Sequence, residues 1–223
     1  MCGRMGRAQE HERVERHFGV GWPDGLGCET YNIAPQSIQP VIIQSGEKRQ
    51  VRLMKWGLVP SWAKSLDIGF STFNARAEEI AFKPAFRDSI QTRRCLVPAD
   101  FFYEWQKIGR AKQPFAIAMR DGSVFAFAGI WDQWHQAGIA LESFSIITTE
   151  ANEVITPIHN RMPVIIAPAD YNRWLAATSA PLDLLKPYPA EQMHAWPVSA
   201  RVGNTQHDDK RLIEAQPSES LFG

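Results

Sequence analysis

The second residue of the chain is a cysteine, and removal of Met1 would make it the N-terminus. An N-terminal Cys2 carries an α-amine and a thiol on one residue, with unperturbed pKa values of about 7.7–8.0 and about 8.5. An amine with that pKa is partly neutral at physiological pH, so it can attack an aldehyde. The neighbouring thiol can then close on the imine carbon and form a five-membered thiazolidine ring. Cys2 therefore predicts covalent capture of an aldehyde, on condition that Met1 is removed.

Two further side chains have the chemistry to move protons. Glu104 lies between Tyr103 and Trp105, in a segment apolar enough to be a buried strand or the end of one. A buried carboxylate is costly unless it is paired, which favours a functional role for Glu104. His159 follows Ile158 in a proline-bounded segment, and an unperturbed imidazole pKa near about 6.5 suits proton transfer. Both are candidate acid/base groups.

A second group of residues could hold a charged or aromatic ligand. Asn74 and Arg76 are two apart, so on an extended segment they share a face. The amide can hold a sugar or an amine, and the guanidinium can clamp a phosphate. Arg4 and Arg161 fit the same phosphate role, or either serves as an ion-pair partner. Faces on which unpaired bases could stack are offered by Pro35, Trp56 and Trp62.

Composition limits the class of protein. The chain has 223 residues, 44% hydrophobic content and eight tryptophans, which is typical of a packed globular protein. Without an internal repeat, a low-complexity linker or a break in composition, we expect one domain over residues 1–223. Lysine plus arginine equals aspartate plus glutamate at 24 each, so no global field steers the protein towards nucleic acid. An anionic ligand would therefore need a local basic patch.

The cysteines indicate the compartment. Cys2, Cys28 and Cys95 have neither metal-ligand spacing nor the pattern of a disulfide framework. Cys28 and Cys95 are interpreted as reduced thiols of a cytoplasmic protein. The N-terminus is polar and no apolar run approaches about 18 residues, so neither a signal peptide nor a membrane span is expected. We expect a monomer that needs no metal and no cofactor.

The elements that must position these residues are mostly strands. Residues 8–18 predict a short amphipathic helix, because Val14 and Phe18 are four apart. Two further short helices are expected at 169–177 and 208–215. Strands are expected where β-branched and aromatic runs are bounded by glycine, aspartate or proline, at 38–43, 51–58, 114–119, 124–130, 144–148 and 164–166. The fold class is therefore α+β, with a mainly antiparallel, barrel-like core and short peripheral helices.

Separated motifs, in order along the chain, combine into one pattern. Met1-Cys2-Gly3-Arg4 opens it, the polar segments 56–62, 73–78, 94–105 and 148–163 follow, and a tail at 198–214 closes it. The pattern resembles the SRAP family, the SOS-response-associated peptidase-like proteins. Two positions depart from the family pattern. Phe101 stands where glycine is expected, which would be costly if the backbone there had φ > 0, and Gly203 stands where asparagine is expected.

The resemblance implies an enzyme that crosslinks itself, through Cys2, to abasic sites in single-stranded DNA. An abasic deoxyribose is in part an open-chain aldehyde, the electrophile that Cys2 suits. The adduct would protect the lesion, its reversal is possible, and the family name suggests a peptidase activity, at its smallest the removal of Met1. The resemblance places Glu104 opposite the Cys2 amine. The implied catalytic residues are Cys2, Asn74, Glu104 and His159, and the implied DNA contacts are Gly3, Arg4, Pro35, Trp56, Arg76 and Arg161.

Two alternatives stay open at this point. An N-terminal-nucleophile glutamine amidotransferase also begins Met-Cys-Gly, and its thiol attacks an amide with its own α-amine as base. That family continues from Cys-Gly into an apolar strand, whereas residues 4–7 are cationic and predict a turn. The other alternative is a module that binds single-stranded nucleic acid and in which Cys2 is inert.

Overall fold

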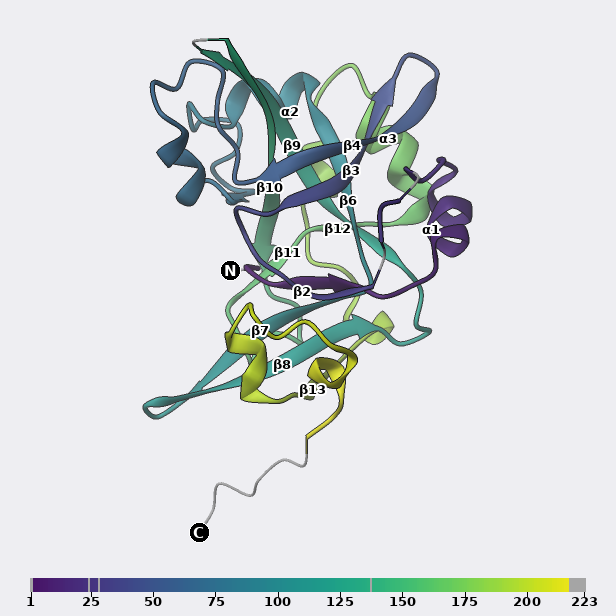
Figure 1. Cartoon of the computed structure of the whole chain (residues 1–223), viewed down its shortest axis with the longest axis vertical. Coiled ribbons are helices and arrows are strands. Elements are labelled where there is room, and N and C mark those ends of the chain that lie inside the picture. The colour runs from purple at the N-terminus through teal and green to yellow at the C-terminus, as the bar shows by residue number, and fades with distance from the viewer. Residues whose placement is uncertain (1, 24, 28, 137, 217–223) are drawn as a thin grey trace.

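Two β-sheets make up most of the molecule, and they meet near the N-terminus (Figure 1). The computed structural model describes residues 2–216 except positions 24, 28 and 137. One sheet has the strand order β13-β8-β7-β1-β2 and the other β11-β10-β4-β3-β6-β9-β12, with β5 paired to β10. The strands are β1 (Met5–Arg7), β2 (Thr30–Ile33), β3 (Ile38–Ser45), β4 (Lys48–Trp56), β5 (Asn74–Arg76), β6 (Arg94–Ala99), β7 (Phe101–Ile108), β8 (Ala111–Met119), β9 (Phe125–Gln136), β10 (Ile139–Glu150), β11 (Arg161–Pro163), β12 (Ile165–Ile166) and β13 (Met193–Pro197).

The helices are short and peripheral. The α-helices are α1 (His11–Phe18), α2 (Arg87–Thr92) and α3 (Tyr171–Ala176). Single 3-10 turns complete the set: η1 (Leu66–Phe70), η2 (Pro168–Asp170), η3 (Leu182–Leu184), η4 (Ala190–Gln192), η5 (Ala200–Gly203) and η6 (Lys210–Ile213). None of the helices in the described ranges is long and apolar enough to cross a membrane.

The larger sheet closes on itself. Strands β10, β4, β3, β6 and β9 pair in that order, and β9 pairs with β10 again, which makes a closed five-stranded barrel. Most pairings are antiparallel, while β4 and β5 run parallel to β10. The expected α+β fold with a barrel-like core is confirmed. Closure removes the exposed edges of these strands, so the barrel is a stiff frame for the elements attached to it.

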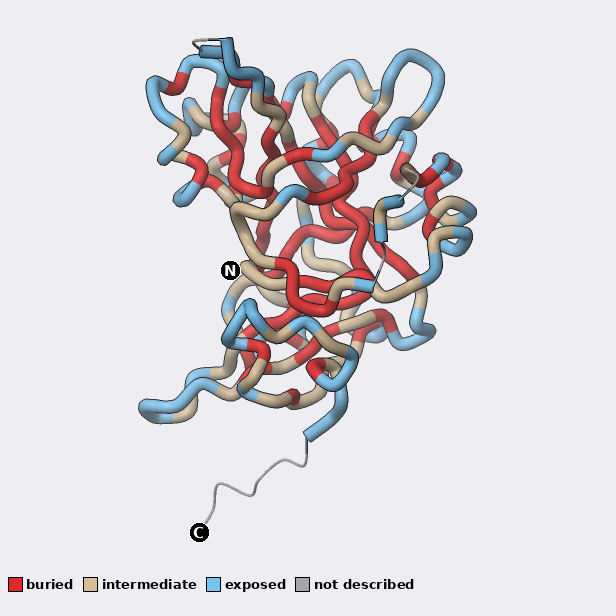
Figure 2. The backbone as a smooth tube through the Cα atoms, viewed as in Figure 1, coloured by how far each residue is buried: buried red, intermediate tan, exposed pale blue. Residues whose placement is uncertain are grey.

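Alternation along the strands separates two hydrophobic clusters. Buried residues run through the barrel strands and the centre of the smaller sheet (Figure 2). All five barrel strands contribute inward residues to one cluster, for example Val97 of β6 and Phe144 of β10. Their alternate residues, such as Leu96 and Ile147, face the opposite way and pack against the helices. The buried face of α1 belongs to this outer layer through Val14 and Phe18, as the four-residue spacing predicts.

The smaller sheet packs on the barrel through the inner cluster. Phe102 of β7 and Met5 of β1 join that cluster together with Cys2. Our expectation of a turn at residues 4–7 is wrong, because Met5–Arg7 is a buried strand between β2 and β7. Backbone pairing on both sides, rather than apolar side chains alone, holds this cationic segment in the sheet.

Other local expectations have mixed outcomes. The expected strands are all present, with shifted ends, and 169–177 forms η2 and α3. The helix expected at 208–215 is only the 3-10 turn η6, which begins at Lys210 after the N-cap Asp209, whose side chain accepts from Arg211 N. Phe101 lies in β7 and does not need φ > 0, since Gln36 is the one non-glycine residue with positive φ in the described ranges. The Phe101 ring instead covers Gly6, where a Cβ would lie 2.2 Å from it.

Candidate active site

Cys2 lies where the two sheets meet, three residues before the start of β1. Its side chain is fully buried, and its carbonyl oxygen accepts a 2.7 Å hydrogen bond from Asn74 Nδ2 of β5. Burial raises the pKa of the Cys2 thiol, and the negative charge of Glu104 raises it further. The thiol is therefore protonated at neutral pH. Met1, whose removal the sequence analysis expects, lies outside the described residues, as does Cys28.

Glu104 faces the N-terminal segment from β7. The register pairs Met5 with Phe102, and Tyr103 N donates to Arg4 O over 3.0 Å, so the same alignment brings Gly3 opposite Glu104. The Glu104 side chain is only 2% exposed. Burial raises the pKa of its carboxyl group, while the nearby His159 lowers it. The pKa of this carboxyl group is thus higher than that of a surface glutamate, which suits a group that accepts and returns a proton.

His159 comes from the segment between β10 and β11. A helical turn sets its position, in which His159 N donates to Ile155 O over 2.9 Å and the Asn152 side chain accepts from Ile155 N. Arg161 N donates to His159 Nδ1 over 2.9 Å. Nδ1 also lies 3.2 Å from Arg161 O, and as the acceptor of the shorter contact it leaves the proton of the neutral ring on Nε2. When it is protonated, His159 lowers the pKa of Glu104, which places the two candidate acid/base groups in one site.

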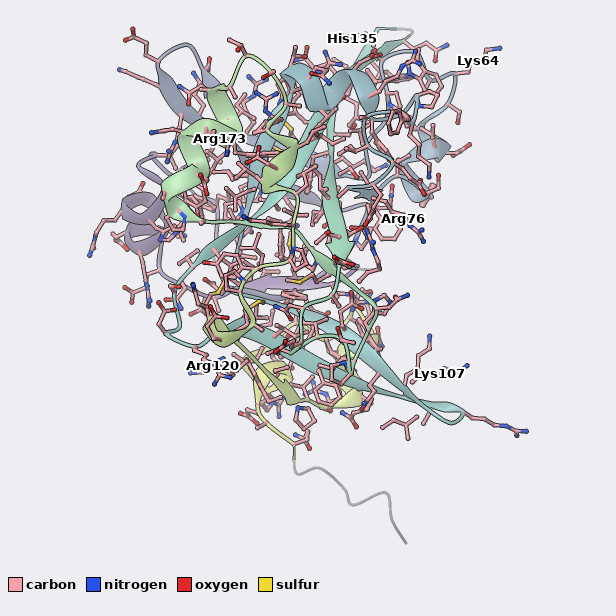
Figure 3. The ribbon with its side chains drawn as sticks, turned by 180° about the vertical axis from the view of Figure 1, so that it is seen from behind. Lys64, Arg76, Lys107, Arg120, His135 and Arg173 are labelled. Carbon is pink, nitrogen blue, oxygen red and sulfur yellow. The ribbon has the colours of Figure 1, made fainter. Side chains whose placement is uncertain are left out.

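Asn74 and Arg76 lie on β5, the short strand that runs parallel to β10 with Asn74 beside Ile146 and Arg76 beside Thr148. The shared face predicted from their spacing follows from this pairing. Asn74 uses Nδ2 on Cys2, and its buried Oδ1 accepts no hydrogen bond from the described residues. Arg76 is the more exposed, at 56%, and its nearest carboxylate is Glu79 at 3.9 Å. Its guanidinium is therefore open to a ligand (Figure 3).

The other two arginines of the prediction are engaged within the protein. Arg161 makes a two-pronged ion pair with Glu78, at 2.7 and 2.9 Å, and donates to Thr148 O. Arg4 donates to Asn32 Oδ1 and to Val202 O, both at 2.7 Å, and lies over the ring of Trp105. For both, the structure shows an internal partner, and contact with a phosphate stays a prediction.

Asn32 is a residue to which the sequence analysis gave no role. Its Nδ2 donates to the carbonyls of Val202, Asn204 and His207, while its Oδ1 accepts from Arg4. One side chain thus ties the C-terminal segment to the N-terminal strand. The only signal in the sequence is that Asn32 follows Tyr31 in a run that otherwise alternates as a strand, where a buried amide needs partners.

Trp56 is a correction. It was expected to offer a face to a base, but it is fully buried inside the barrel, where it stacks on Phe144 and donates through Nε1 to Phe73 O. Trp62, six residues later, is 55% exposed and has the free face that Trp56 lacks. The loop between them is fixed at Gly57, where φ is +135° and an added Cβ would lie 2.5 Å from Gly69 O, so a side chain is excluded. Gln36, next to the half-buried Pro35, donates to the same Gly69 O.

Comparison with known proteins identifies the family of the chain. The family model of the SOS response associated peptidases (SRAP) matches residues 1–205. The chain belongs to the SRAP family. It is 37% identical to the abasic site processing protein YoqW of Bacillus subtilis, over 96% of this chain and 100% of that protein. It is 31% identical to the abasic site processing protein HMCES of Gallus gallus, over 94% of this chain and 70% of that protein.

The fold of the family is also seen in a solved structure. A crystal structure of a protein from Bacteroides thetaiotaomicron has a TM-score of 0.87 and 29% identity, and the match covers 96% of this chain and 100% of that one. The SRAP barrel described above is thus shared with a protein whose structure was determined by X-ray crystallography.

Proposed function

We propose that this SRAP protein captures abasic sites in single-stranded DNA by forming a thiazolidine through Cys2. The observation that carries the proposal is the grouping of Cys2 with Asn74, Glu104 and His159, which come from four separate segments of the chain. The relatives are named abasic site processing proteins, which points to the same substrate. The electrophile is the aldehyde of the ring-opened deoxyribose.

The amine of Cys2, rather than its thiol, makes the first attack. A thiol whose pKa is raised by burial and by Glu104 holds little thiolate at neutral pH. The α-amine adds to the aldehyde carbon, the carbinolamine loses water, and a cationic iminium results. That positive charge lowers the pKa of the adjacent thiol, which adds to the imine carbon as its proton leaves. The products are a thiazolidine and one water.

The side chains around Cys2 have separate parts in this sequence. Glu104 accepts the proton of the α-ammonium and returns one to the departing hydroxyl group. His159 supplies a proton to the ring oxygen of the sugar as the ring opens, from Nε2, because its Nδ1 already accepts from Arg161 N. Asn74 fixes the Cys2 carbonyl through Nδ2 and offers its buried Oδ1 to the α-amine. By microscopic reversibility the same groups serve release of the DNA.

The DNA contacts divide by accessibility. Arg76 is free to hold a phosphate, and the exposed Trp62 can stack on an unpaired base. Gly3 lies opposite Glu104, and Pro35 lies in the turn next to the Trp62 loop. Arg4 and Arg161 reach a phosphate only if they give up Asn32 or Glu78. A bound single strand therefore depends first on Arg76.

Intact-mass measurement tests the proposal against its alternatives. Mature protein is incubated with abasic single-stranded DNA, and we expect one heat-stable adduct per chain, lighter by one water than the sum of its parts. Release of ammonia from glutamine without an adduct would support the amidotransferase alternative, and neither product would support an inert binding module. His159→Ala should slow crosslinking at saturating DNA by about 10²-fold or more. An unchanged rate with weakened binding would make His159 a binding residue.

A further inference from the structure

The hairpin of β7 and β8 projects from the molecule and ends in a basic tip (Figures 2 and 3). Lys107, Arg110 and Lys112 are all exposed there. The sequence from 105 to 120 contains no aspartate or glutamate. In the described ranges none of the three forms an ion pair, whereas Arg161, Arg173 and other cations do. The charge of the tip is thus left uncompensated by the fold.

The hairpin forms an arm whose tip carries a cost in stability. Gly109, with φ of +58°, and Arg110 form a two-residue turn between the paired Ile108 and Ala111, and glycine at the first turn position fits a tight hairpin turn. The register places Lys107 directly opposite Lys112. Like charges opposite one another destabilise a strand pair, so this arrangement is unfavourable unless an anion lies between or beside them.

The arm begins at the site. Lys107 is three residues beyond Glu104 on the same strand, a span of about 10 Å, with its side chain on the other face of β7. Gln106 Nε2 donates over 3.0 Å to Pro157 O, in the segment that carries His159. Arg76 and Lys107 project from the same side of the molecule (Figure 3). A strand held at Arg76 and at Cys2 would therefore continue towards the tip.

We propose that Lys107, Arg110 and Lys112 bind backbone phosphates of the single strand that flanks the abasic nucleotide. This inference rests on the proposed function, since it extends the DNA footprint beyond the crosslinking site. On a protein with no net charge, a local group of three cations supplies the attraction that the molecule as a whole lacks. Contacts to phosphates carry no sequence preference, which suits a lesion that occurs in any sequence.

The test compares two triple variants on undamaged single strands of two lengths, about 16 and about 4 nucleotides. Lys107→Gln/Arg110→Gln/Lys112→Gln removes the tip charges. Arg16→Gln/Lys48→Gln/Arg120→Gln removes three exposed charges elsewhere, among them Arg120, on the opposite side from Lys107 (Figure 3). We expect the tip variant to lower the salt slope of binding to the long strand by about 2, from about 0.7 per phosphate contact. The short strand and the control variant should show no such change.

Several outcomes would overturn the proposal that the hairpin tip binds DNA. An unchanged slope on the long strand, an equal loss on both lengths, or a change seen only with flanking duplex would each contradict contacts to a flanking single strand. Crosslinking to a short abasic strand reports on the proposed function separately, and the tip variant should crosslink there at the wild-type rate. Should the wild type form no adduct, the proposed function fails. The salt slopes on undamaged DNA would still show whether the hairpin tip binds phosphates.

Discussion

The barrel and the smaller sheet use buried polar groups in different ways. Inside the barrel the buried thiol of Cys95 and the ring of Trp56 lie among apolar side chains, and burial raises the pKa of the Cys95 thiol. The smaller sheet buries several polar side chains, among them Arg7, Asn32 and Glu104, and Glu104 and the adjacent Cys2 meet side chains from barrel-attached segments. Two cysteines with equal burial thus have unequal surroundings, and only Cys2 has a carboxylate, an amide and an imidazole at hand.

This difference shows where reactivity can be placed in the fold. The closed barrel pairs its strands with one another, and its buried Ser143 and Asp132 accept hydrogen bonds from Val59 N and Ser61 N of the loop after β4. The smaller sheet receives the N-terminus between β2 and β7, so a terminal residue ends against a buried carboxylate. The barrel supplies the opposite wall through β5 and the segment before β11. The site needs both sheets, and the predictions below separate their contributions.

The largest effect is expected at Cys2. Cys2→Ser retains the amine and can form an imine, but it cannot form a thiazolidine, so no heat-stable adduct with abasic single-stranded DNA should survive without reductant. Cys95→Ala removes the buried barrel thiol as a matched control and should leave the adduct intact. Denaturing electrophoresis after heating measures both. An adduct of wild-type stability from Cys2→Ser would refute the thiazolidine.

Glu104→Gln should have the next largest effect, a decrease in the single-turnover crosslinking rate of about 10²–10⁴-fold. Size and hydrogen bonding are nearly retained, so the loss reports proton transfer. Because burial raises the pKa of Glu104, the wild-type rate should rise as the pH increases through that raised pKa, and the variant should lack this rise. Rates across pH 5 to 9 would show it. A wild-type pH profile in Glu104→Gln would exclude Glu104 as the base.

These groups differ in how well the sequence predicts them. Glu104 was recognisable because an apolar strand contained one carboxylate, and the shared face of Asn74 and Arg76 followed from strand periodicity. The partners of Arg4 and Arg161 could not be predicted from the sequence. Asn32 and Glu78 are far from them in the chain, and only the folded topology brings them together. The prediction that Trp56 offers a face to a base was wrong for the same reason. Composition shows that a tryptophan is present, and barrel closure decides whether it faces base or core.

Asn74→Ala should slow crosslinking by up to about tenfold, because one hydrogen bond to the Cys2 carbonyl is worth about 0.5–1.5 kcal/mol net. The effect should fall on the rate at saturating DNA and not on affinity for undamaged strands, since Asn74 positions Cys2 from the barrel side. Single-turnover rates alongside equilibrium binding distinguish the two. Weakened binding with an unchanged rate would assign Asn74 to the DNA instead.

Arg76→Gln should weaken binding to all single-stranded sequences alike and lower the salt slope by about 0.7, the value for one phosphate contact. Arg173→Gln is the matched control, because Arg173 is similarly exposed at 50% but pairs with Asp183 on the opposite side of the molecule (Figure 3). Titrations at several salt concentrations measure both variants. Equal slopes for Arg76→Gln and wild type would remove Arg76 from the DNA site.

The smallest expected effect is on the free energy of unfolding. It tests whether the burial of Glu104 makes the folded protein less stable. Since the folded pKa of Glu104 is raised, the folded protein binds more protons than the unfolded chain between the two pKa values. The free energy of unfolding therefore falls as the pH rises from about 4.3 through the folded pKa, by about 1.4 kcal/mol for each unit of difference.

Glu104→Gln lacks this loss, so it should be more stable than wild type at pH 8 and differ less at pH 5. A gain of about 1 kcal/mol corresponds to about 2–4 °C in Tm for a chain of this size. Thermal unfolding at both pH values measures it, with Glu142→Gln of β10 as a control at a partly exposed barrel carboxylate that is paired with Arg52. That control should lose stability rather than gain it. A lower Tm for Glu104→Gln at pH 8 would mean that its partners in the site outweigh burial, and that the active carboxylate stabilises the fold.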